Sequence, residues 1–437
     1  MTRYIAHIII EADTPLKVGS NGSDFLQDSP VQKDWNGLPM ILGTSIAGVL
    51  RKEFDGDTND IFGDEDGSKV IFSNALLCID NENSVKETLL FDADKSDFLK
   101  LFDNLPIREH TAITDKGVAR ENSKFDEEVV YRGTRFKFSI EMIEDDQKSF
   151  EDILNLLHKN SFRLGGGSTK GFGKIKIIEI KTNKFDKDSY KNYSSSLNFD
   201  LIDNREYQKE DKETNYINYT LKIKPDNFFM FGSGFGDSDA DQTPVYEKEV
   251  DYKNSKLSEK QILIPASSIK GALAHRVAYH YNKAVGATIE SNNAKVGENN
   301  EAVKDIFGHK KELAKDKKTE LGQKGKILIS DCFKKFDEKK QTKTFDHVSI
   351  DRFTGGAIDG ALFQEKTIAD DREYVIEILL KKNIDDTYIK AFELALQDIC
   401  NGMLPLGGAT TKGHGLFCGV LEKDEKIIFN GECPNEN

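Results

Sequence analysis

The sequence predicts an α+β fold made of two tandem βαββαβ modules, and an internal repeat is the first reason. Leu164–Gly173 and Leu406–Gly415 are identical at seven of ten positions, including Thr-Lys-Gly, at an offset of 242 residues. The second reason is that strand and helix patterns follow the same order in each half. A length of 437 residues also suits two domains of about 200 residues each.

Two further pairs of similar segments occur in the same order in both halves. Ile41–Leu50 (ILGTSIAGVL) resembles Ile264–Leu273 (IPASSIKGAL) at an offset of 223 residues. Asp60–Gly63 and Asp305–Gly308 both read Asp-Ile-Phe-Gly, at an offset of 245 residues. The larger offset arises across the polar stretch 283–303, which the second half has gained. Three matches in one order indicate a tandem duplication.

Each half then reads strand, helix, strand, strand, helix, strand. The first half is expected to place these elements, in order, at Arg3–Glu11, Thr44–Phe54, Lys69–Ile79, Thr134–Ile143, Gln147–Lys159 and Phe172–Ile180. The second half is expected to place them at Tyr216–Lys224, Ala266–Asn282, Lys326–Phe333, Glu373–Leu380, Asp386–Cys400 and His414–Leu421. The second helix of each half carries an apolar stripe at helical spacing, which indicates a core-facing side.

This order is that of the ferredoxin-like unit and of the RNA recognition motif, which presents a sheet to single-stranded RNA. We expect a first module over residues 1–181, a polar linker over 182–214 and a second module over 215–437. A long excursion separates the second and third strands of each module. Two β-prone runs around Gly355-Gly356, within Val348–Leu362, predict that this excursion projects as a hairpin.

Composition narrows the class of protein. The formal net charge is −14, so nothing in the overall balance indicates nucleic acid, and any such contact must be local. The sequence shows no signal peptide and no apolar run long enough to span a membrane. Five cysteines show no CxxC pair, which favours reduced thiols in a cytoplasmic protein over a zinc site or a disulfide framework.

The duplicated glycine-rich loop is the first candidate binding feature. Consecutive glycines let a backbone approach a ligand and turn its N–H groups outward, and a lysine adds a cation for a phosphate. The candidate residues are Gly165, Gly166 and Lys170 in the first half and Gly407, Gly408 and Lys412 in the second. A tight turn without a ligand is the alternative interpretation. Retention of Thr-Lys-Gly in both copies favours phosphate binding.

The start of the first helix in each half is the second candidate feature, because helix N-termini attract anions. Hydroxyl groups stand there as candidate caps, and a basic residue follows on a later turn. These candidates are Gly43, Thr44, Ser45 and Arg51, and in the second half Ser267, Ser268 and Lys270. Neither copy has both basic residues. Ala47 stands in the first half where the second has Lys270, and Ala274 stands in the second half where the first has Arg51. Plain capping is the alternative interpretation, and both can hold.

Acidic residues precede these helices. Asp28 begins Asp-Ser-Pro-Val, and Asp241 begins Asp-Gln-Thr-Pro-Val. A carboxylate beside bound RNA can hold Mg²⁺ or orient a 2′-hydroxyl for attack on the adjacent phosphate. Aspartate before Ser-Pro is also ordinary turn chemistry, so the pattern alone leaves both interpretations open.

Together these features resemble the RAMP superfamily of CRISPR proteins, and specifically the backbone subunits of type III effector complexes. The resemblance rests on the glycine-rich loop, the helix start, the Asp-Ser-Pro-Val segment and the run Val-Ser-Ile-Asp-Arg-Phe-Thr-Gly-Gly-Ala at 348–357. It covers most of both halves. A usual backbone subunit has one such module, so this chain looks like a fused double subunit.

The resemblance implies RNA-guided recognition. Each module would grip the backbone of a guide RNA, while base pairing would read a complementary target RNA. The hairpin, which contains Arg352, would act as a thumb that interrupts the pairing. Partners would be guide RNA, target RNA, further RAMP subunits and a large polymerase-like subunit, with no membrane.

The resemblance also implies a catalytic role for the two acids. Asp28 stands where type III backbone subunits carry the aspartate that cuts target RNA with a divalent metal, Mg²⁺ or Mn²⁺. Asp241 is the candidate in the second half, with Asp239 as the substitute if the loop register shifts.

Two other functions remain open. The first is a guide-binding scaffold without catalysis. The second is a guide-processing endoribonuclease with a histidine general base, for which His275 and His280 are the candidates.

Overall fold

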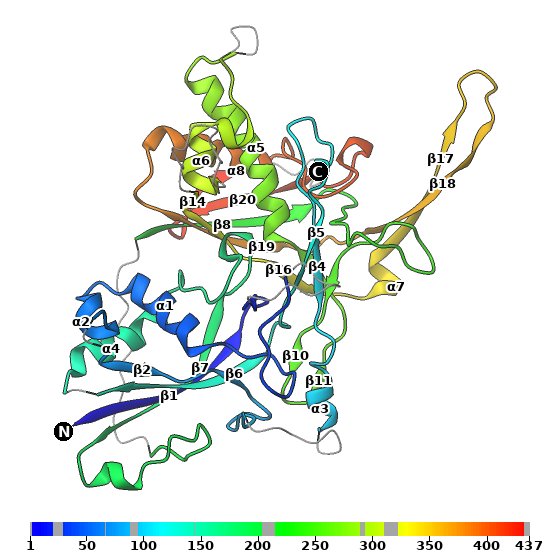
Figure 1. Ribbon diagram of the computed structural model, residues 1–437. Helices are drawn as coiled ribbons and strands as arrows, with labels where there is room; N and C mark the ends of the chain where they lie inside the picture. The colour runs from blue at the N-terminus through cyan, green and yellow to red at the C-terminus, as the bar shows by residue number, and fades with distance from the viewer. Residues whose placement is uncertain are drawn as a thin grey trace.

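The computed structural model describes residues 2–20, 29–65, 67–87, 95–143, 145–202, 215–288, 293–309 and 322–431. The first half forms the lower part of Figure 1 and the second half the upper part, and each has its own antiparallel sheet and helices. Two separate hydrophobic clusters lie mainly one in each half, and Val250 of the second half belongs to that of the first. The chain is therefore a mixed α+β protein built from two similar halves.

The sheet of the first half has the strand order β2-β6-β1-β7, and β3 also pairs with β6. Its elements are β1 Arg3–Ala12, α1 Gly43–Glu53, β2 Val70–Phe72, β3 Leu76–Leu77, β6 Arg135–Met142, α4 Gln147–Leu156 and β7 Ile175–Phe185. Helix α4 buries Phe150, Ile153 and Leu154 against this sheet, as the apolar stripe predicts. The short helices α2 Thr58–Phe62 and α3 Asp97–Lys100 lie at the edges.

The sheet of the second half has the order β15-β19-β8-β20-β21. Its elements are β8 Tyr216–Pro225, α5 Ala266–Ala284, α6 Glu301–Phe307, β15 Ile327–Ile329, β19 Tyr374–Lys381, α8 Asp386–Cys400, β20 Phe417–Lys423 and β21 Lys426–Asn430. The corresponding strands of the two halves thus occupy the same places in their sheets. Helix α8 has the predicted bounds and buries Phe392, Ala395 and Ile399.

The second strand of each half is broken, whereas the sequence predicts one continuous strand. In the first half the break lies at Ser73-Asn74, between β2 and β3. In the second half it lies at Ser330-Asp331, after which β16 Cys332–Lys335 leaves the sheet and pairs with β12 Gln261–Ile264. The break frees the second residue of each pair, Asn74 and Asp331, to bond the start of a helix.

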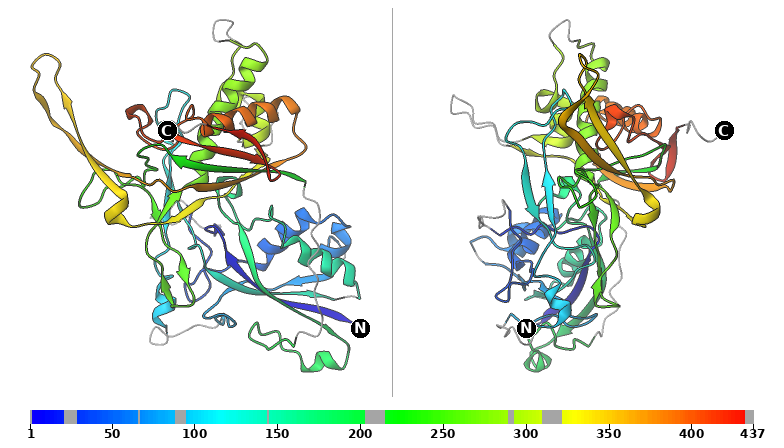
Figure 2. Two further views of the ribbon diagram at one scale, coloured as in Figure 1. Left: turned by 180° about the vertical axis from the view of Figure 1, so that it is seen from behind. Right: turned by 90° about the vertical axis from the view of Figure 1, so that its right-hand side faces the viewer.

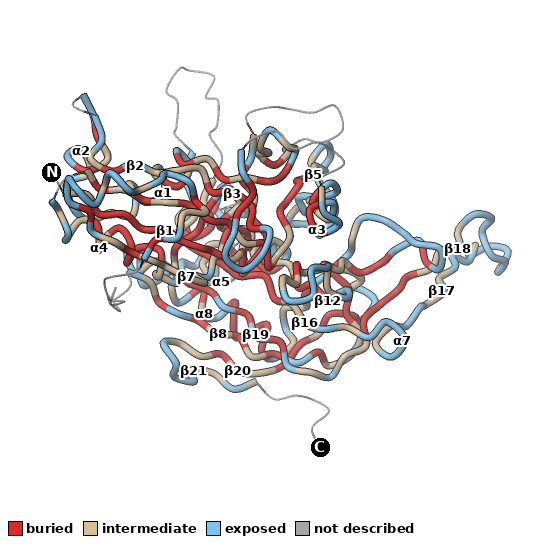
Figure 3. The backbone as a smooth tube through the Cα atoms, turned by 90° about the horizontal axis from the view of Figure 1, so that it is seen from below, coloured by how far each residue is buried: buried red, intermediate tan, exposed pale blue. Residues whose placement is uncertain are grey.

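Both excursions form hairpins. In the first half, β4 Ile107–His110 pairs with β5 Phe125–Glu128. In the second half, β17 Thr342–Ile350 pairs with β18 Ala357–Ile368, after the short helix α7 Glu338–Gln341. This second hairpin projects far from the rest of the molecule (Figures 1 and 2), as the sequence predicts, and its outer part is exposed (Figure 3).

The segment after β7 differs from a plain polar linker. β7 continues past residue 181 to Phe185, and the following chain returns over β1. Phe185 and Leu201 pack there on Ile5, with Tyr190, Tyr193 and Phe199 around them. These aromatic side chains cover a patch of the sheet of the first half. Residues 203–214 of the expected linker lie outside the described residues.

Three cysteines, Cys78, Cys332 and Cys400, are free and buried, as expected for reduced thiols. Cys418 is disulfide-bonded, so the expectation of thiols throughout is wrong for it. Among the described residues, no helix is both long enough and apolar enough to cross a membrane.

Candidate nucleic-acid interface

The two glycine-rich loops have the same structure. Gly165 and Gly407 have φ of 80° and 92°, and a side chain at either would collide with a backbone carbonyl, of Lys17 or Met230 respectively. Leu164 N donates to Gly173 O at 2.9 Å, and Leu406 N donates to Gly415 O at 2.8 Å. These glycines are therefore required by close backbone packing within each half.

The N–H groups of Gly166 and Gly408 do not point outward, contrary to the sequence-based expectation. Gly166 N donates to Lys17 O at 2.7 Å, and Gly408 N donates to Met230 O at 2.6 Å. Carbonyls of the segments that follow β1 and β8 accept from these donors, so both N–H groups are satisfied within their own half. The loop can then contact a phosphate through its side chains.

The loop lysine of the first half belongs to a charged cluster at the base of the hairpin. Lys170 Nζ lies 3.3 Å from Glu127 Oε1 and 4.6 Å from the centre of the Phe125 ring. Lys17 and His110 also contact Glu127, whose side chain is only 6% exposed. Burial alone would raise the pKa of Glu127, but bonds from His110 and Lys17 and the charge of Lys170 lower it to about 2.

The second half repeats this cluster except for Lys17, whose position is taken by Met230. Lys412 Nζ lies 2.8 Å from Glu365 Oε2 and 4.8 Å from the centre of the Phe363 ring. His347 stacks on Phe363 with ring centres 4.8 Å apart, as His110 stacks on Phe125 at 5.1 Å. Neither glutamate is among the residues that the sequence motifs predict. The similarity of Phe-Asp-Glu-Glu at 125–128 to Phe-Gln-Glu-Lys at 363–366 is the signal that reveals them.

The helix starts are capped from outside the helix. Leu42 and Pro265 occupy the cap positions, and neither supplies a side-chain cap bond. Instead Gly43 N donates to Asn74 Oδ1 at 2.9 Å, and Ala266 N donates to Asp331 Oδ1 at 2.8 Å. The expectation of hydroxyl caps is therefore wrong, because the helices begin before those hydroxyls. Thr44, Ser45, Ser267 and Ser268 lie on the first turns and are exposed or half-buried.

The loop of the first half meets the helix start of the second half. Lys270 Nζ, on the first turns of α5, donates to Thr169 Oγ1 at 3.1 Å. Burial, and then the positive charge of Lys170, lower the pKa of Lys270 to about 8. Two lysines that disfavour each other's charge beside a loop hydroxyl would both be stabilised by an anion between them.

Arg51 does not lie at this kind of site. It stands in the last turn of α1, about 12 Å along the axis from the helix start. Its guanidinium donates to Gly63 O at 3.0 Å and to Asn59 Oδ1 at 2.8 Å. Seven residues of helix separate it from Gly43, so the two cannot share a phosphate as expected.

The tip of the β17–β18 hairpin presents the last predicted binding residue. Arg352 is exposed there, and the neighbouring Phe353 is 100% exposed. A fully exposed ring next to a cation can stack on an unpaired base. Figure 2 shows that the hairpin carries this tip well away from both sheets.

The candidate acids can be compared through the backbone register of their loops. Ser20 N donates to Pro30 O, and Ser233 N donates to Thr243 O, so positions 20 and 30 correspond to 233 and 243, an offset of 213. Asp241 therefore corresponds to Asp28, and Asp239 does not. Asp28 itself lies outside the described residues.

Asp241 is exposed, and its Oδ2 accepts a hydrogen bond from Gln364 N at 2.7 Å. Asp237 and Asp239 face Lys366 at 2.6 and 3.7 Å. Within the described parts of the chain, no group of three or more His, Cys, Asp or Glu residues could hold a metal ion.

The two candidate histidines are engaged in packing contacts. His280 Nε2 lies 2.6 Å from Asp398 Oδ2, which also binds Arg276 at 2.5 Å, and this joins α5 to α8. His275 Nε2 lies 3.3 Å from Ile113 O. The two are bound to different partners, so the structure does not unite them in one site.

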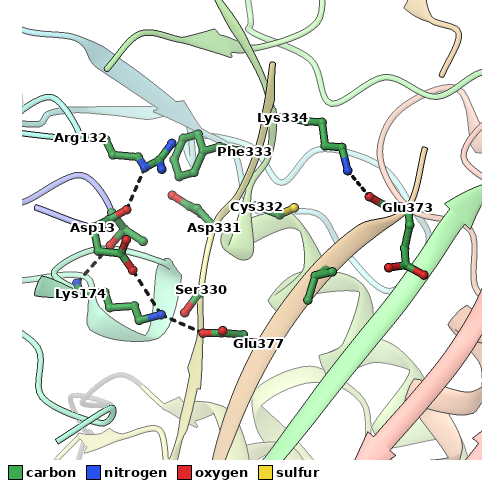
Figure 4. A pocket seen from close by; sticks show the side chains of 12 residues that line it. Asp13, Arg132, Lys174, Ser330, Asp331, Cys332, Phe333, Lys334, Glu373 and Glu377 are labelled. Carbon is green, nitrogen blue, oxygen red and sulfur yellow. Dashed lines mark hydrogen bonds and ion pairs between the residues drawn. The ribbon is translucent and has the colours of Figure 1, made fainter. Parts of the chain in front are cut away.

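A cleft between the halves is lined by charges that are already paired (Figure 4). Lys174 Nζ lies 3.2 Å from Asp13 Oδ2 and 2.8 Å from Glu377 Oε2. The guanidinium of Arg132 lies 4.8 Å from the centre of the Phe333 ring. We interpret this cleft as part of the junction and not as a ligand site.

No curated protein matches the chain. The solved structure "Cryo-EM structure of the Type III-B Cmr-beta bound to cognate target RNA" contains a similar chain with 19% identity and a TM-score of 0.32. The similarity covers 42% of this chain and 61% of that one, so this chain spans less than two thirds of that chain's length.

A family model gives the assignment. It matches residues 9–176, in the first half, and residues 244–418, in the second. The two matched regions include both glycine-rich loops and both hairpins, and together they make up well over half of the sequence. The chain therefore belongs to the RAMP superfamily, with one matched region in each of its halves.

Proposed function

We propose that the chain is a double backbone subunit of a type III CRISPR effector. Each half is then a ferredoxin-like RAMP module that holds the phosphate backbone of a guide RNA. The contact between Lys270 and Thr169 carries this proposal, because it assembles two lysines and a hydroxyl at the junction of the modules. Guide RNA, target RNA, further RAMP subunits and a large polymerase-like subunit are the proposed partners.

An anionic ligand would stabilise the ammonium group of Lys270 at the junction. Lys270 is half-buried and burial lowers its pKa to about 8, and within the described part of the chain its ammonium makes no ion pair with a carboxylate. A phosphate oxygen would supply an anionic partner and would also accept from the Thr169 hydroxyl. Such contacts position a nucleic acid without reading its bases, which base pairing would do.

Cleavage of target RNA is the proposed catalytic activity, and we assign it to the first half. Asp28 is the proposed catalytic residue, with Mg²⁺ or Mn²⁺ as the cofactor that would assist attack on a target phosphate. Asp241 occupies the corresponding position, but one of its carboxylate oxygens already accepts from Gln364 N. We expect Asp241 to support the root of the β17–β18 hairpin and not to cut.

The test is cleavage of guide-complementary RNA by the assembled complex with Asp28→Ala, Asp241→Ala and both. Asp28→Ala should remove one set of fragments, and Asp241→Ala should leave the pattern unchanged. If the double variant gives the wild-type fragments, the catalytic assignment is overturned. Guide binding, measured on the same complexes, separates this failure from failure of the binding proposal.

A guide-binding scaffold without catalysis is the second candidate function. The engaged carboxylate of Asp241 favours it for the second half. Guide processing is disfavoured, because His280 is bound to Asp398 between two helices. Specific cutting of an unprocessed repeat RNA by the isolated chain would instead favour guide processing over the scaffold function.

A further inference from the structure

The junction between the halves joins two surfaces of opposite charge. The loop surface of the first half consists of Arg108, Thr169, Gly171 and Lys174, and the helix-start surface of the second half consists of Glu247, Ala266, Lys270, Asp331 and Glu377. Arg108 is buried between Glu247 and Asp331, with a distance of 2.6 Å to Asp331 Oδ2. Lys174 reaches Glu377 at 2.8 Å.

Each junction residue has a counterpart on an outer face of the chain. Arg108 lies opposite Glu127 in its hairpin, and Phe345 lies opposite Glu365 in the other, so Phe345 takes the place of Arg108. Alignment of the loops places Thr411, Gly413 and Leu416 at the positions of Thr169, Gly171 and Lys174. These three residues and Phe345 define the loop surface of the second half.

The counterparts on the helix-start side come from the same registers. Asn74 and Asp331 both accept from the first N–H of their helix, so they correspond. Ser73 N donates to Ser139 O as Ser330 N donates to Glu377 O, so Ser139 corresponds to Glu377. The remaining counterparts of this surface, on the first half, are Asp34 for Glu247 and Ala47 for Lys270.

The inner loop surface is covered, whereas the outer one is open. A side chain at Gly171 would collide with the carboxylate of Asp331 and with Ala266 of the other half. A side chain at Gly413 would meet no atom of the described residues within 4 Å. Thr411 is exposed next to it. The second half therefore offers a free surface of the same construction as the inner one.

The outer surfaces lack the charges that hold the inner junction. If a second copy stacked on this loop surface as the halves stack on each other, Phe345 would face Asn74 and Asp34. Asp34 Oδ1 accepts from Asn36 N and Leu38 N in its own turn, and the carboxylate would lose its remaining water without gaining the cation that Arg108 gives Glu247. Leu416 would face Ser139, and Thr411 would face Ala47, so the other polar pairs would be absent too.

We propose that the chain rejects a second copy of itself at this surface. The outer loop surface of the second half instead takes the helix start of a different RAMP module, one with no acid opposite Phe345. Phe345 is suited to such a partner, because its ring packs edge-on against Phe228 at 5.0 Å and His414 at 5.6 Å and forms an apolar floor. The inference concerns protein contacts and does not require RNA binding.

Native mass spectrometry of the full chain, with and without RNA of two lengths, tests the proposal. We expect one chain of 49.2 kDa in the absence of RNA and one chain per RNA at either length. Multimers of the wild-type chain alone, or copy numbers that grow with RNA length, would overturn it. If RNA does not bind at all, the proposed function fails, and the RNA-free measurement still decides this inference.

A variant that restores the missing charges should gain the self-association that the wild-type chain lacks. Phe345→Arg together with Asn74→Asp would recreate the Arg108–Asp331 pair between copies, and we expect head-to-tail multimers at concentrations where the wild type is a single chain. Phe345→Leu with Asn74→Asp is the matched control and should stay a single chain. Failure of a folded charge-restoring variant to associate would overturn the role of these residues. Mixing a Phe345→Arg chain with an Asn74→Asp chain repeats the test if the double variant does not fold.

Discussion

Lys270 Nζ donates to Thr169 Oγ1 across the junction of the two halves, at 3.1 Å. The two residues are 101 positions apart in the sequence, and each belongs to a feature that occurs twice in the chain. Lys270 follows a repeated helix start, and Thr169 lies in a repeated loop. The junction thus combines the loop of one module with the helix of the next, which neither module can do alone.

Loss of the Lys270 cation should weaken guide RNA binding without changing sequence preference. In Lys270→Ala, we expect affinity for guide-length RNA to fall and the slope of log K against log salt to shrink by about 0.7 to 1. Filter binding across a salt series measures both. Arg51→Ala is the matched control, because Arg51 is held by Gly63 and Asn59, and its salt slope should equal that of the wild type.

RNA affinity should decrease as the pH rises through about 8, where the Lys270 ammonium loses its proton. One linked proton gives a loss of up to about tenfold for each pH unit above that value. Stability of the RNA-free chain should move in the opposite direction: the folded pKa lies below the unfolded value of 10.5, so the unfolded state binds more protons between the two and folding gains with pH. In Lys270→Arg the affinity should stay flat. A flat profile in the wild type would contradict this role.

Gly165→Ala should destabilise the first half. A left-handed backbone costs an L-residue about 1–2 kcal/mol, and the new methyl group would also collide with Lys17 O. Gly48→Ala is the control: Gly48 lies on an exposed face of α1 with no described atom near its Cβ position, and the change should stabilise the helix by about 0.5–1 kcal/mol. Urea denaturation followed by circular dichroism compares them. Equal effects of the two changes would show that the loop geometry is not required.

Removal of Arg108 should destabilise the junction strongly. Arg108→Met leaves the buried carboxylates of Glu247 and Asp331 without their cation, a change that costs about 3–5 kcal/mol in comparable buried pairs. Adding Glu247→Gln and Asp331→Asn to Arg108→Met should recover part of this loss, because the unpaired charges are then gone. Calorimetric melting of the three forms measures it, with Arg352→Ala as an exposed control. No recovery in the triple variant would mean that packing of the Arg108 side chain, and not its charge, dominates.

Sequence patterns located the regular elements well, because the apolar stripes of α4 and α8 and the buried strands follow simple periods. The patterns did not reveal the breaks at Ser73-Asn74 and Ser330-Asp331. Apolar residues flank each break on both sides, and the bond that Asn74 or Asp331 makes to a helix start accounts for it.

The candidate site was predicted in part. The loop lysines and the helix starts are repeated motifs and could be found by comparing the halves. Glu127 was missed because it meets Lys170 only through the register of a hairpin, 43 residues earlier in the chain. The position of Arg51 differs from the prediction because about 12 Å along the axis of α1 separates it from the helix start.

The most direct test of the account is to cross-link guide RNA to the assembled complex and map the cross-linked peptides. If both halves bind one guide RNA, peptides with Thr169–Lys170, Lys270 and Thr411–Lys412 cross-link to its sugar-phosphate chain. The Thr411–Lys412 contact is then displaced along the guide from the other two. Cross-links confined to one half, or absent from both loops while the complex still holds its guide, would contradict the claim that both halves bind the same RNA.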